Sequence, residues 1–562
     1  MISERKAMHA GEAVAEALRE EGVEKVYSVP GSHIHPIYDG LSRVEMIRMV
    51  TCKQEPNVSL MADAYGRITG KPGVCLVTAG PGGLNSMAGV AQAYGAASPM
   101  VHIGGAVPLD ADMEAFHGVD QPAFVHHMFE HITKWSARVE RIEHIPEVFA
   151  KAFHIARSGR PGPVHVELPR LSDYSEYILQ EAPAVVPSYK SIPPVVNGPD
   201  AADVDRFAKR LTEAASPVIA AGKGILRRGA VAALAELASR LQAPVVCAQD
   251  AIGVLPETHP LFAGHFARNR SNPLADRTLR AADLVIGIGL RAGTAEMSEL
   301  RERAPKNLIL IGFDSVAEAR YRGDDERVAD PKLFLNALLE RLGTFRKPVN
   351  DALAKTLADA KAAALRNVVA QVEPHKNEKP IHPGVLMNAL RSVLREDAVV
   401  ASDVGNCQQW ARSFCPITNA ESLMQSGVWN AMSYALPTAI VAKMECPQRD
   451  VVALAGDGAF LMTCGDLPTA AEYGANILMV VLNDGAFGQT FMQQTNLYGH
   501  TYGTTFKSPN FAQMAESCGA EGIRVTEPGD IESALRAGLD ATKRRPALVE
   551  VLVADRPYPK LA

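Results

Sequence analysis

The chain lacks the sequence patterns of several common protein classes. Its eight cysteines are scattered without a Cys-x-x-Cys pair, which argues against a zinc site and against a disulfide framework. It has no block of lysines and arginines, and the formal net charge of −6 gives no basic surface for nucleic acid. No apolar run approaches the roughly 18 residues of a membrane-spanning helix. No GxGxxG follows the first predicted strand, so a nicotinamide dehydrogenase is disfavoured.

The N-terminal residues lead into an amphipathic helical pattern and not into the apolar core of a secretion signal. Scattered, unpaired thiols are typical of a reducing compartment. Together these features predict a cytoplasmic protein.

A chain of 562 residues is long enough for several domains. Short apolar strands alternate with helical stretches three times along it, which predicts an α/β fold of three doubly wound parallel-sheet domains. We expect the domains at residues 1–182, 190–345 and 375–562. A proline-rich linker at 183–199 separates the first two domains, and a solvated helix at 351–373 connects the second to the third.

Two polar motifs follow neighbouring apolar strands of the third predicted domain. Gly456-Asp457-Gly458 comes after the strand at 451–455, and Asn483-Asp484-Gly485 comes after the strand at 477–482. Glycines let the backbone approach a phosphate, and Mg²⁺ prefers one or two carboxylates together with phosphate oxygens. The pair of motifs therefore predicts a site for a metal and a diphosphate.

This spacing resembles the motif of the thiamin-diphosphate (ThDP)-dependent enzyme family, and the likeness extends along the whole chain. The resemblance implies a pyrimidine-binding, a middle and a diphosphate-binding domain, in that order. It also implies that Asp457, Asp484 and the carbonyl of Ala486 hold Mg²⁺, although the family usually has asparagine where Asp484 stands. Gly456, Gly458 and Ala459 would contact the cofactor.

In the first domain, the segment at 51–67 resembles the family's HEQ…MADGYAR run, which places Glu55 on the glutamate that protonates the aminopyrimidine ring of ThDP. The alternative is a glutamate that merely starts a helix and is stabilised there by the helix dipole. The glycine-rich turn at 78–85 resembles the family's SGPGATN loop, so Gly82 and Asn85 are expected to face the cofactor.

Two further segments resemble acetolactate synthases. The run at 402–410 is similar to their DVGQHQMW, which implies that Gly405 and Asn406 pack around the diphosphate. Met432 falls where such enzymes place a bulky apolar residue that holds ThDP in its bent shape. A methionine is otherwise usually a core residue.

The predicted substrate pocket departs from acetolactate synthase. Gly31, Ser32 and His33 resemble the GAHI of benzaldehyde lyase, whose histidine acts on the hydroxyl of the bound intermediate. His117, beside Phe116, stands where the synthases have glutamine, and Gln489, Thr490 and Gln493 replace bulkier apolar residues. The resemblance therefore makes Glu55, His33 and His117 the candidate catalytic residues, although most histidines at such positions are surface residues.

FAD in the central domain is left open. Residues 289–291 resemble part of the flavin-binding GxRxD of acetolactate synthases, but Gly293 stands where the aspartate belongs. The loop at 221–224 fits a nucleotide and equally fits a plain turn.

The resemblance implies an acetolactate synthase-like carboligase or decarboxylase, which uses ThDP and Mg²⁺ and acts on 2-oxo acids or aldehydes through an acyl-anion equivalent. One alternative is a benzaldehyde lyase-like aldehyde lyase or a simple 2-oxo-acid decarboxylase. Another, from a different class, is a catalytically silent nucleotide-binding regulatory subunit. A homodimer or homotetramer with sites shared between subunits is expected, with no nucleic-acid or membrane partner.

Overall fold

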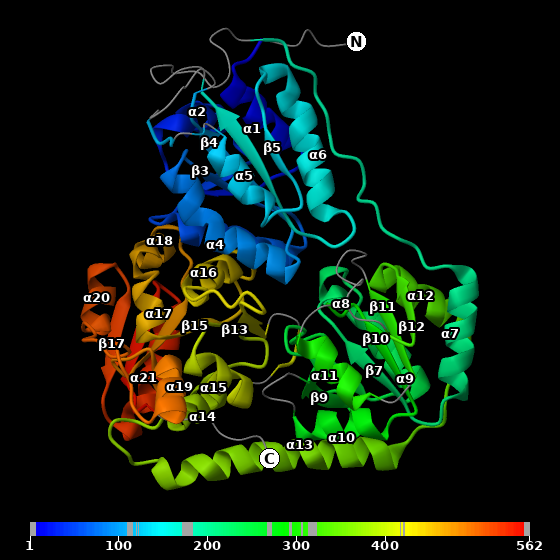
Figure 1. Ribbon diagram of the computed structural model, residues 1–562. Coiled ribbons are helices and arrows are strands. Elements are labelled where there is room, and N and C mark those ends of the chain that lie inside the picture. The colour runs from blue at the N-terminus through cyan, green and yellow to red at the C-terminus, as the bar shows by residue number, and fades with distance from the viewer. Residues whose placement is uncertain are drawn as a thin grey trace. The chain divides into compact units, whose positions relative to one another are not determined.

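The computed structural model describes residues 7–108, 116–119, 121, 123–170, 184–266, 272–291, 295–304, 307–312, 323–415, 417–419 and 422–555. Contacts divide the chain into two compact units. The first comprises Met1–Val195, Val428–Pro447 and Leu461–Ala475, and the second comprises Val196–Gly427, Gln448–Phe460 and Asn476–Ala562. The described residues form three six-stranded sheets in which all strand pairs are parallel (Figure 1), which confirms the predicted fold class.

The first sheet belongs to the first unit and has the strand order β2-β1-β3-β4-β6-β5. Its strands are β1 (Lys25–Ser28), β2 (Arg48–Thr51), β3 (Gly73–Val77), β4 (Met100–Ala106), β5 (Ser136–Arg138) and β6 (Pro163–Pro169). The helices between them are α1 (Ala10–Glu20), η1 (Ser32–Ile34), α2 (His35–Leu41), α3 (Glu55–Thr69), α4 (Pro81–Ala96), α5 (Phe124–Glu130), η2 (Ile142–His144) and α6 (Ile145–Arg157).

The second sheet belongs to the second unit and has the order β12-β11-β10-β7-β8-β9. Its strands are β7 (Pro217–Ala221), β8 (Val245–Ala248), β9 (Phe262–Phe266), β10 (Leu284–Ile288), β11 (Leu308–Gly312) and β12 (Asp325–Val328). The helices of this part are α7 (Ala201–Glu213), α8 (Gly224–Arg227), α9 (Val231–Leu241), α10 (Pro273–Ala281), α11 (Ala295–Arg303) and α12 (Pro331–Leu342).

The third sheet, also in the second unit, has the order β14-β13-β15-β16-β18-β17, the same pattern as the first sheet. Its strands are β13 (Val399–Ser402), β14 (Leu423–Gln425), β15 (Val451–Gly456), β16 (Leu478–Asn483), β17 (Glu521–Val525) and β18 (Ala547–Leu552). The helices of this part of the chain are α14 (Pro383–Val393), α15 (Asn406–Phe414), α16 (Ala435–Glu445), α17 (Asp457–Leu461), η5 (Cys464–Asp466), α18 (Leu467–Glu472), α19 (Gly488–Tyr498), α20 (Phe511–Ser517), η6 (Pro528–Asp530) and α21 (Ile531–Ala541).

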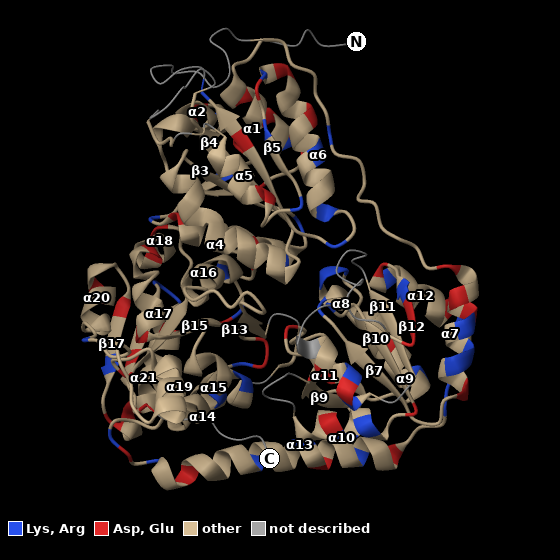
Figure 2. Cartoon of the chain, in the orientation of Figure 1, with Lys and Arg blue, Asp and Glu red and all other residues tan. Residues whose placement is uncertain are grey.

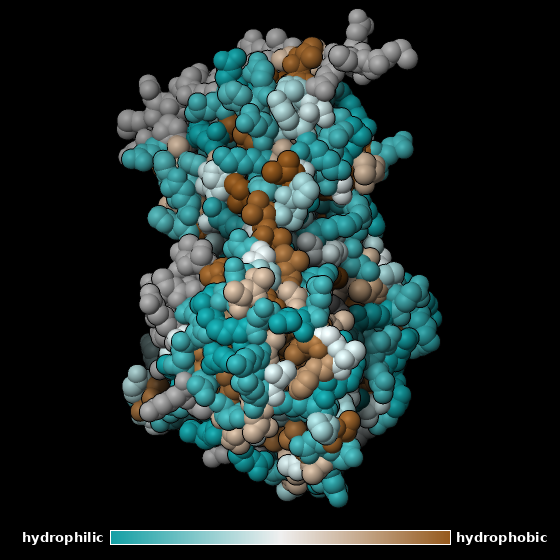
Figure 3. All heavy atoms as spheres, turned by 90° about the vertical axis from the view of Figure 1, so that its right-hand side faces the viewer, coloured by the Kyte–Doolittle hydropathy of each residue, from teal (hydrophilic) through white to brown (hydrophobic). Residues whose placement is uncertain are grey.

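A long helix, α13 (Asp351–Val372), connects the second and third sheets and is followed by η4 (Glu373–His375). Within it only Leu357, Val368 and Val372 are buried, as expected for a solvated connector. Residues of both charge signs lie along α13 (Figure 2), as expected for a helix with a hydrated outer face. The face shown in Figure 3 is mostly hydrophilic, with scattered apolar residues. In the described part of the chain, no helix combines the length and the apolar character needed to cross a bilayer.

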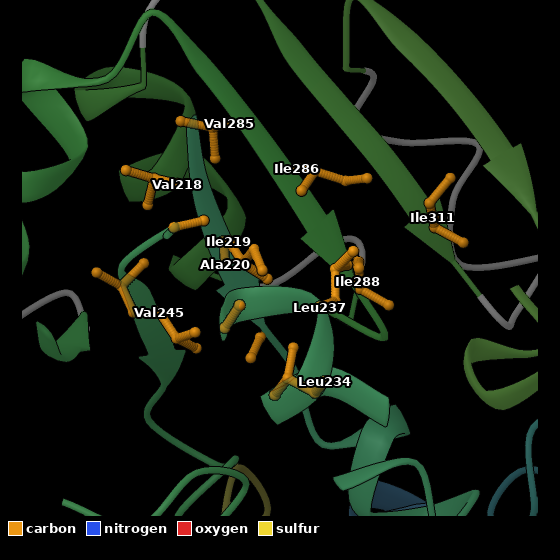
Figure 4. Close-up of a cluster of buried hydrophobic side chains, with 14 of the residues drawn as sticks. Val218, Ile219, Ala220, Leu234, Leu237, Val245, Val285, Ile286, Ile288 and Ile311 are labelled. Atoms are coloured by element: carbon orange, nitrogen blue, oxygen red, sulfur yellow. The ribbon is translucent and has the colours of Figure 1, made fainter. Parts of the chain in front are cut away.

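The interior strands are apolar on both faces because helices cover both sides of a parallel sheet. In the central sheet every residue of β7, β10 and β11 is buried. Leu234 and Leu237 of α9 belong to the same hydrophobic cluster as Ile219 and Ile288 of these strands (Figure 4). Such runs make the sheet a rigid base for the loops that follow its strands.

Inside each sheet there is a point at which successive strands begin to be added on the other side of the first strand. Ligands of open α/β sheets bind outside the carboxyl ends of the strands at such a point. In the first sheet this point lies between β1 and β3, in the second between β7 and β10, and in the third between β13 and β15. The turns and helix starts that follow β1, β3, β13 and β15 contain Ser32, Gly82, Asn406 and Asp457. The topology therefore places predicted site residues where ligands bind.

Candidate active site

The loop after β1 brings Gly31 against Thr78, the residue that follows β3. A Cβ on Gly31 would lie 2.4 Å from the Cβ of Thr78, so only glycine allows this approach. The 3₁₀ helix η1 then places Ser32 and His33 at the edge of the sheet, where Ser32 Oγ lies 3.3 Å from His33 Nδ1.

His33 forms an aromatic cluster with the other predicted pocket residues of the first unit. Its ring is stacked on that of His117, with centroids 5.0 Å apart, and its centroid is 5.8 Å from that of Phe116. His33 is fully buried, whereas Phe116 is 60% exposed. His117 has a φ of 68°, and a Cβ on Gly80 would lie 2.2 Å from its carbonyl oxygen. The two candidate histidines thus lie in contact with each other. One ring nitrogen of each is buried without a hydrogen bond among the described residues. These nitrogens are His33 Nε2 and His117 Nδ1.

Burial makes both imidazoles poor proton acceptors. It lowers the pKa of His33 to about 4, helped by the charges of His117 and Arg170 and opposed by a backbone hydrogen bond at Phe116. Burial also lowers the pKa of His117, against a backbone hydrogen bond at Ala79. His33 is therefore neutral at physiological pH.

We expect the His33 imidazole to stay neutral throughout the range from about pH 5.5 to pH 8, because its pKa lies below that range. Histidine-selective isotope labelling and NMR should show no titration of this ring in the folded protein and a midpoint near 6.5 in the urea-unfolded chain. A folded-state midpoint above about 6 would mean that the ring is hydrated and not enclosed.

Glu55 and Asn85 come together from two different helices of the first unit. Glu55 is the first residue of α3 and is half-buried, and Asn85 lies in the first turns of α4. Asn85 Nδ2 donates a hydrogen bond to Glu55 Oε2 at 3.3 Å. Gly82, in the same turn, packs closely on β3, because a Cβ added to it would lie 3.0 Å from Thr78 Cγ2. Glu55 begins a helix, which fits the alternative that it is only a helix-start residue. It also contacts Asn85, which is itself predicted to face the cofactor.

Met432 lies in the first unit, in the segment between β14 and α16, and is half-buried. Its neighbours Asn430 and Ser433 have positive φ angles of 59° and 77°. Non-glycine residues rarely adopt this conformation, and such strain often marks a functional turn. No interaction among the described residues joins Met432 to the other predicted residues of its unit.

In the second unit, the loop after β15 holds Asp457 in a fixed orientation. Asp457 is fully buried, and its Oδ1 accepts a hydrogen bond from the amide of Gly458 at 2.8 Å. Its Oδ2 accepts from the amide of Gly485 at 2.8 Å and from Ser508 Oγ at 2.7 Å. These bonds hold the two sequence motifs together at the carboxyl ends of β15 and β16.

Asp484 is the second carboxylate of this site. Its Oδ1 accepts from the amide of Ala486 at 3.1 Å. Burial, together with the charges of Asp457 and Asp555, raises the pKa of Asp484 to about 7. Burial also raises the pKa of Asp457. Among the described residues neither carboxylate has an ion pair, so a bound cation would supply the missing positive charge.

The loop that carries Ala486 is held in place by a bridge to residue 505. That bridge uses the amide of Phe487, bonded to Thr504, and the carbonyl of Gly485, bonded to Phe506, each at 2.8–2.9 Å. The carbonyl of Ala486 is not used by the bridge and remains available as an oxygen ligand.

Space for a phosphate lies beside these carboxylates. A Cβ on Gly405, whose φ is 130°, or on Gly456 would have no atom within 4 Å. Asn406 begins α15, and its Oδ1 is buried without a hydrogen bond among the described residues. A Cβ on Gly488 would lie 2.6 Å from Asp484 Oδ2 and 3.1 Å from Asn406 Nδ2. Open glycines, a helix start and buried carboxylates fit a diphosphate and its Mg²⁺.

The remaining predicted residues have structural positions but no shared contact in the described part of the chain. Ala459 is buried in α17, directly after the glycine loop. Gln489, Thr490 and Gln493 lie on one face of α19, a helix with no buried residue. They lie close in sequence to Asp484 and Ala486. No interaction among the described residues joins them to these two residues or to Asp457.

Two residues close to Asp457 and Asp484 were not among the residues expected from the sequence. They are Ser508 and Asp555. Ser508 hydrogen-bonds Asp457 although 51 positions separate them, and no sequence signal indicated it. Asp555 follows β18, whose partner strand is β16, and a Cβ on Gly488 would lie 3.5 Å from its Oδ1. A carboxylate directly after an apolar strand was the available signal.

Models of thiamine pyrophosphate enzyme domains match the chain in order, and thiamine pyrophosphate is another name for ThDP. The N-terminal TPP binding domain matches residues 8–130, the central domain matches 204–338, and the C-terminal TPP binding domain matches 403–551. The fold, the site and these matches define the class: the chain belongs to the thiamine pyrophosphate enzymes. The predicted family and enzyme class, a ThDP-dependent enzyme that makes or breaks carbon–carbon bonds, are confirmed.

Curated relatives narrow the likeness to acetolactate synthase large subunits. The chain is 30% identical to a probable acetolactate synthase large subunit of Methanocaldococcus jannaschii, over 97% of this chain and 92% of the relative. It is also 30% identical to the acetolactate synthase isozyme 3 large subunit of Escherichia coli, over 98% and 96%. The same identity holds for the acetolactate synthase large subunit of Lactococcus lactis, over 98% and 94%.

The central sheet is closely packed where its strand order changes direction. At its switch point the amide of Gly222 donates to the carbonyl of Ile288, and the amide of Gly224 donates to that of Gly289, each at 2.9 Å. Lys223 is buried between these glycines, and its Nζ lies 2.5 Å from Asp250 Oδ2. Backbone bonds and an internal ion pair thus hold the turn after β7 in place. Gly293, which replaces the flavin-motif aspartate, lies outside the described residues.

Proposed function

We propose that this chain is a ThDP- and Mg²⁺-dependent carboligase or decarboxylase that acts on 2-oxo acids or aldehydes. The proposal rests on one observation, that the chain has both sets of residues that the cofactor needs. Glu55 contacts Asn85 in the first unit. Asp457 and Asp484 form a buried carboxylate pair in the second unit. We further propose a homodimer or homotetramer, and domain bounds of 1–182, 190–345 and 375–562.

Asp457, Asp484 and the Ala486 carbonyl would hold Mg²⁺, and Gly405, Asn406 and Gly456 would line the diphosphate. When bound, ThDP supplies an electron sink beside a carbonyl group. Glu55 would hold a proton on its carboxyl group, in an orientation set by the Asn85 amide. The His33 and His117 rings would exclude water from the substrate side and exchange protons with substrate oxygen atoms.

A second function, an aldehyde lyase or simple 2-oxo-acid decarboxylase, is supported by the stacked histidines. An imidazole can protonate a carbanion, whereas the glutamine of the synthases cannot. A silent regulatory subunit would have no need for Glu55 and Asp457 together, so we place it last.

His117→Gln should shift products from released aldehyde towards coupled hydroxyketone, because an amide cannot donate a proton as an imidazolium does. Since burial lowers the pKa of His117, the wild-type ratio should change mainly below about pH 6.5, whereas the variant should show a flat profile. The measurement is the product ratio from about pH 5 to pH 8. An unchanged ratio and an unchanged pH profile would return His117 to a purely structural role.

A test of the whole proposal is to incubate the protein with ThDP, Mg²⁺ and candidate substrates, and to score CO₂ and coupled product separately. Release of CO₂ without coupled product would favour the decarboxylase. Cleavage of benzoin without CO₂ would favour the lyase.

A further inference from the structure

A cavity of about 340 Å³ lies in the second unit, outside the proposed cofactor residues. Three parts of the chain form it: the segment from β8 to β9 of the central sheet, the middle of α13, and the ends of α14 and α15 beside the third sheet. Figure 1 shows α13 running past both sheets. The amide of Glu257 donates to the carbonyl of Ile417 at 2.9 Å, which joins two of these walls. The volume is in the range of small-molecule sites, about 300–1,000 Å³.

Most of the cavity wall is apolar. Each of the three parts contributes buried hydrophobic side chains: Ile252 and Phe262 from the central sheet, Val368 from α13, and Ile417 from the segment after α15. Such a wall favours a ligand with an apolar body.

Two cations at the cavity are bonded only to neutral acceptors among the described residues. Lys361 Nζ donates to the carbonyls of Glu257 and His259, each at 2.9 Å, and Arg391 Nη1 donates to the carbonyl of Phe414 at 2.8 Å. Neither has an ion pair in the described part of the chain. Burial lowers the pKa of Lys361, which shows that its charge is costly there.

Among the described residues of the cavity wall, Glu257 is the one carboxylate that can balance these positive charges. That carboxylate, Glu257, lies 3.4 Å from His265 Nε2, and both ring nitrogens of His265 are buried without a hydrogen bond among the described residues. The wall also contains Arg412. The described lining therefore has an excess of positive charge within an apolar enclosure, which suits an anion more than a neutral or cationic ligand.

We propose that this cavity binds a small monocarboxylate with an apolar body. The carboxylate lies towards Lys361 and Arg391, since a guanidinium and an ammonium match one carboxylate. The hydrocarbon part packs on Ile252, Phe262 and Val368. Such a ligand would contact both sheets of the second unit and the helix that connects them.

The test uses the full chain and hexanoate as the probe, with binding measured by calorimetry. We expect a Kd below about 1 mM. Lys361→Met, which keeps the length of the side chain and removes its charge, should weaken binding at least about tenfold. Lys355→Met, an exposed lysine on the same helix, is the matched control and should bind as the wild type does.

A second variant keeps the test decisive if Lys361→Met fails to fold. Ala364 lines the cavity, so Ala364→Leu should fill it and abolish hexanoate binding, whereas Ala358→Leu, exposed on the same helix, should not. 1-Hexanol should bind at least about tenfold more weakly than hexanoate. The proposal is overturned if wild type shows no binding of hexanoate, if Ala364→Leu binds it unchanged, or if hexyl phosphate binds more tightly than the carboxylate.

Discussion

Glu55→Gln should leave the protein folded and slow cofactor activation at least about a hundredfold, since general acid–base groups contribute about 10²- to 10⁴-fold. That range corresponds to about 3–5 kcal/mol of transition-state stabilisation. The amide keeps the size of the side chain and its contact with Asn85, but it cannot carry the proton that the aminopyrimidine needs. Hydrogen–deuterium exchange at the thiazolium carbon of added ThDP measures this step directly.

The control for this prediction is Glu45→Gln, because Glu45 is an exposed glutamate in the same unit. It should exchange at the wild-type rate. ThDP binding by Glu55→Gln should be retained, which separates activation from affinity. Exchange as fast in Glu55→Gln as in the wild type would remove Glu55 from this role and leave it as the first residue of α3.

Asp457→Ala should abolish Mg²⁺-dependent ThDP binding, with an affinity loss of at least about a hundredfold, because it removes a metal ligand that three hydrogen bonds orient. Asp484→Asn should largely preserve binding, since an amide oxygen can still ligate Mg²⁺. It also removes one of two mutually repelling carboxylates. Titration calorimetry with and without Mg²⁺ distinguishes the two variants.

Asp530→Ala, at an exposed aspartate of the same unit, controls for a general effect of losing a charge. It should bind ThDP normally. Because Asp457 also holds the amides of Gly458 and Gly485, the fold of Asp457→Ala must be checked by circular dichroism. Unimpaired binding by both Asp457→Ala and Asp484→Asn would place the diphosphate elsewhere.

The sequence predicted the interior of the sheets better than their edges. β7, β10 and β11 are fully buried, so their sequences are continuous apolar runs that indicate strands. β12 and β17 are difficult to recognise in the sequence. Both are edge strands in which nearly every residue is half-buried or exposed, so their sequences lack an apolar run.

For the site, motif spacing predicts which residues lie close together where consecutive strands of one sheet deliver them. Asp457 and Asp484 follow β15 and β16, which are paired in register, so their proximity follows from topology. The stacking of His33 on His117 depends on the backbone at His117, whose positive φ no propensity argument predicts. Likewise, nothing in the sequence around Lys223 indicates that its ammonium group pairs with Asp250.

The most direct test of the proposed carboligase or decarboxylase activity is turnover by the wild-type protein. It is incubated with ThDP, Mg²⁺ and a panel of pyruvate, benzoylformate, glyoxylate and benzoin. CO₂ and coupled hydroxyketones are scored separately, with Glu55→Gln as the inactive reference. We expect a coupled hydroxyketone from at least one donor, accompanied by CO₂ when that donor is a 2-oxo acid. Neither product should form without ThDP. A wild-type protein that binds ThDP yet yields no CO₂, no coupled product and no cleavage of benzoin would contradict the proposed activity.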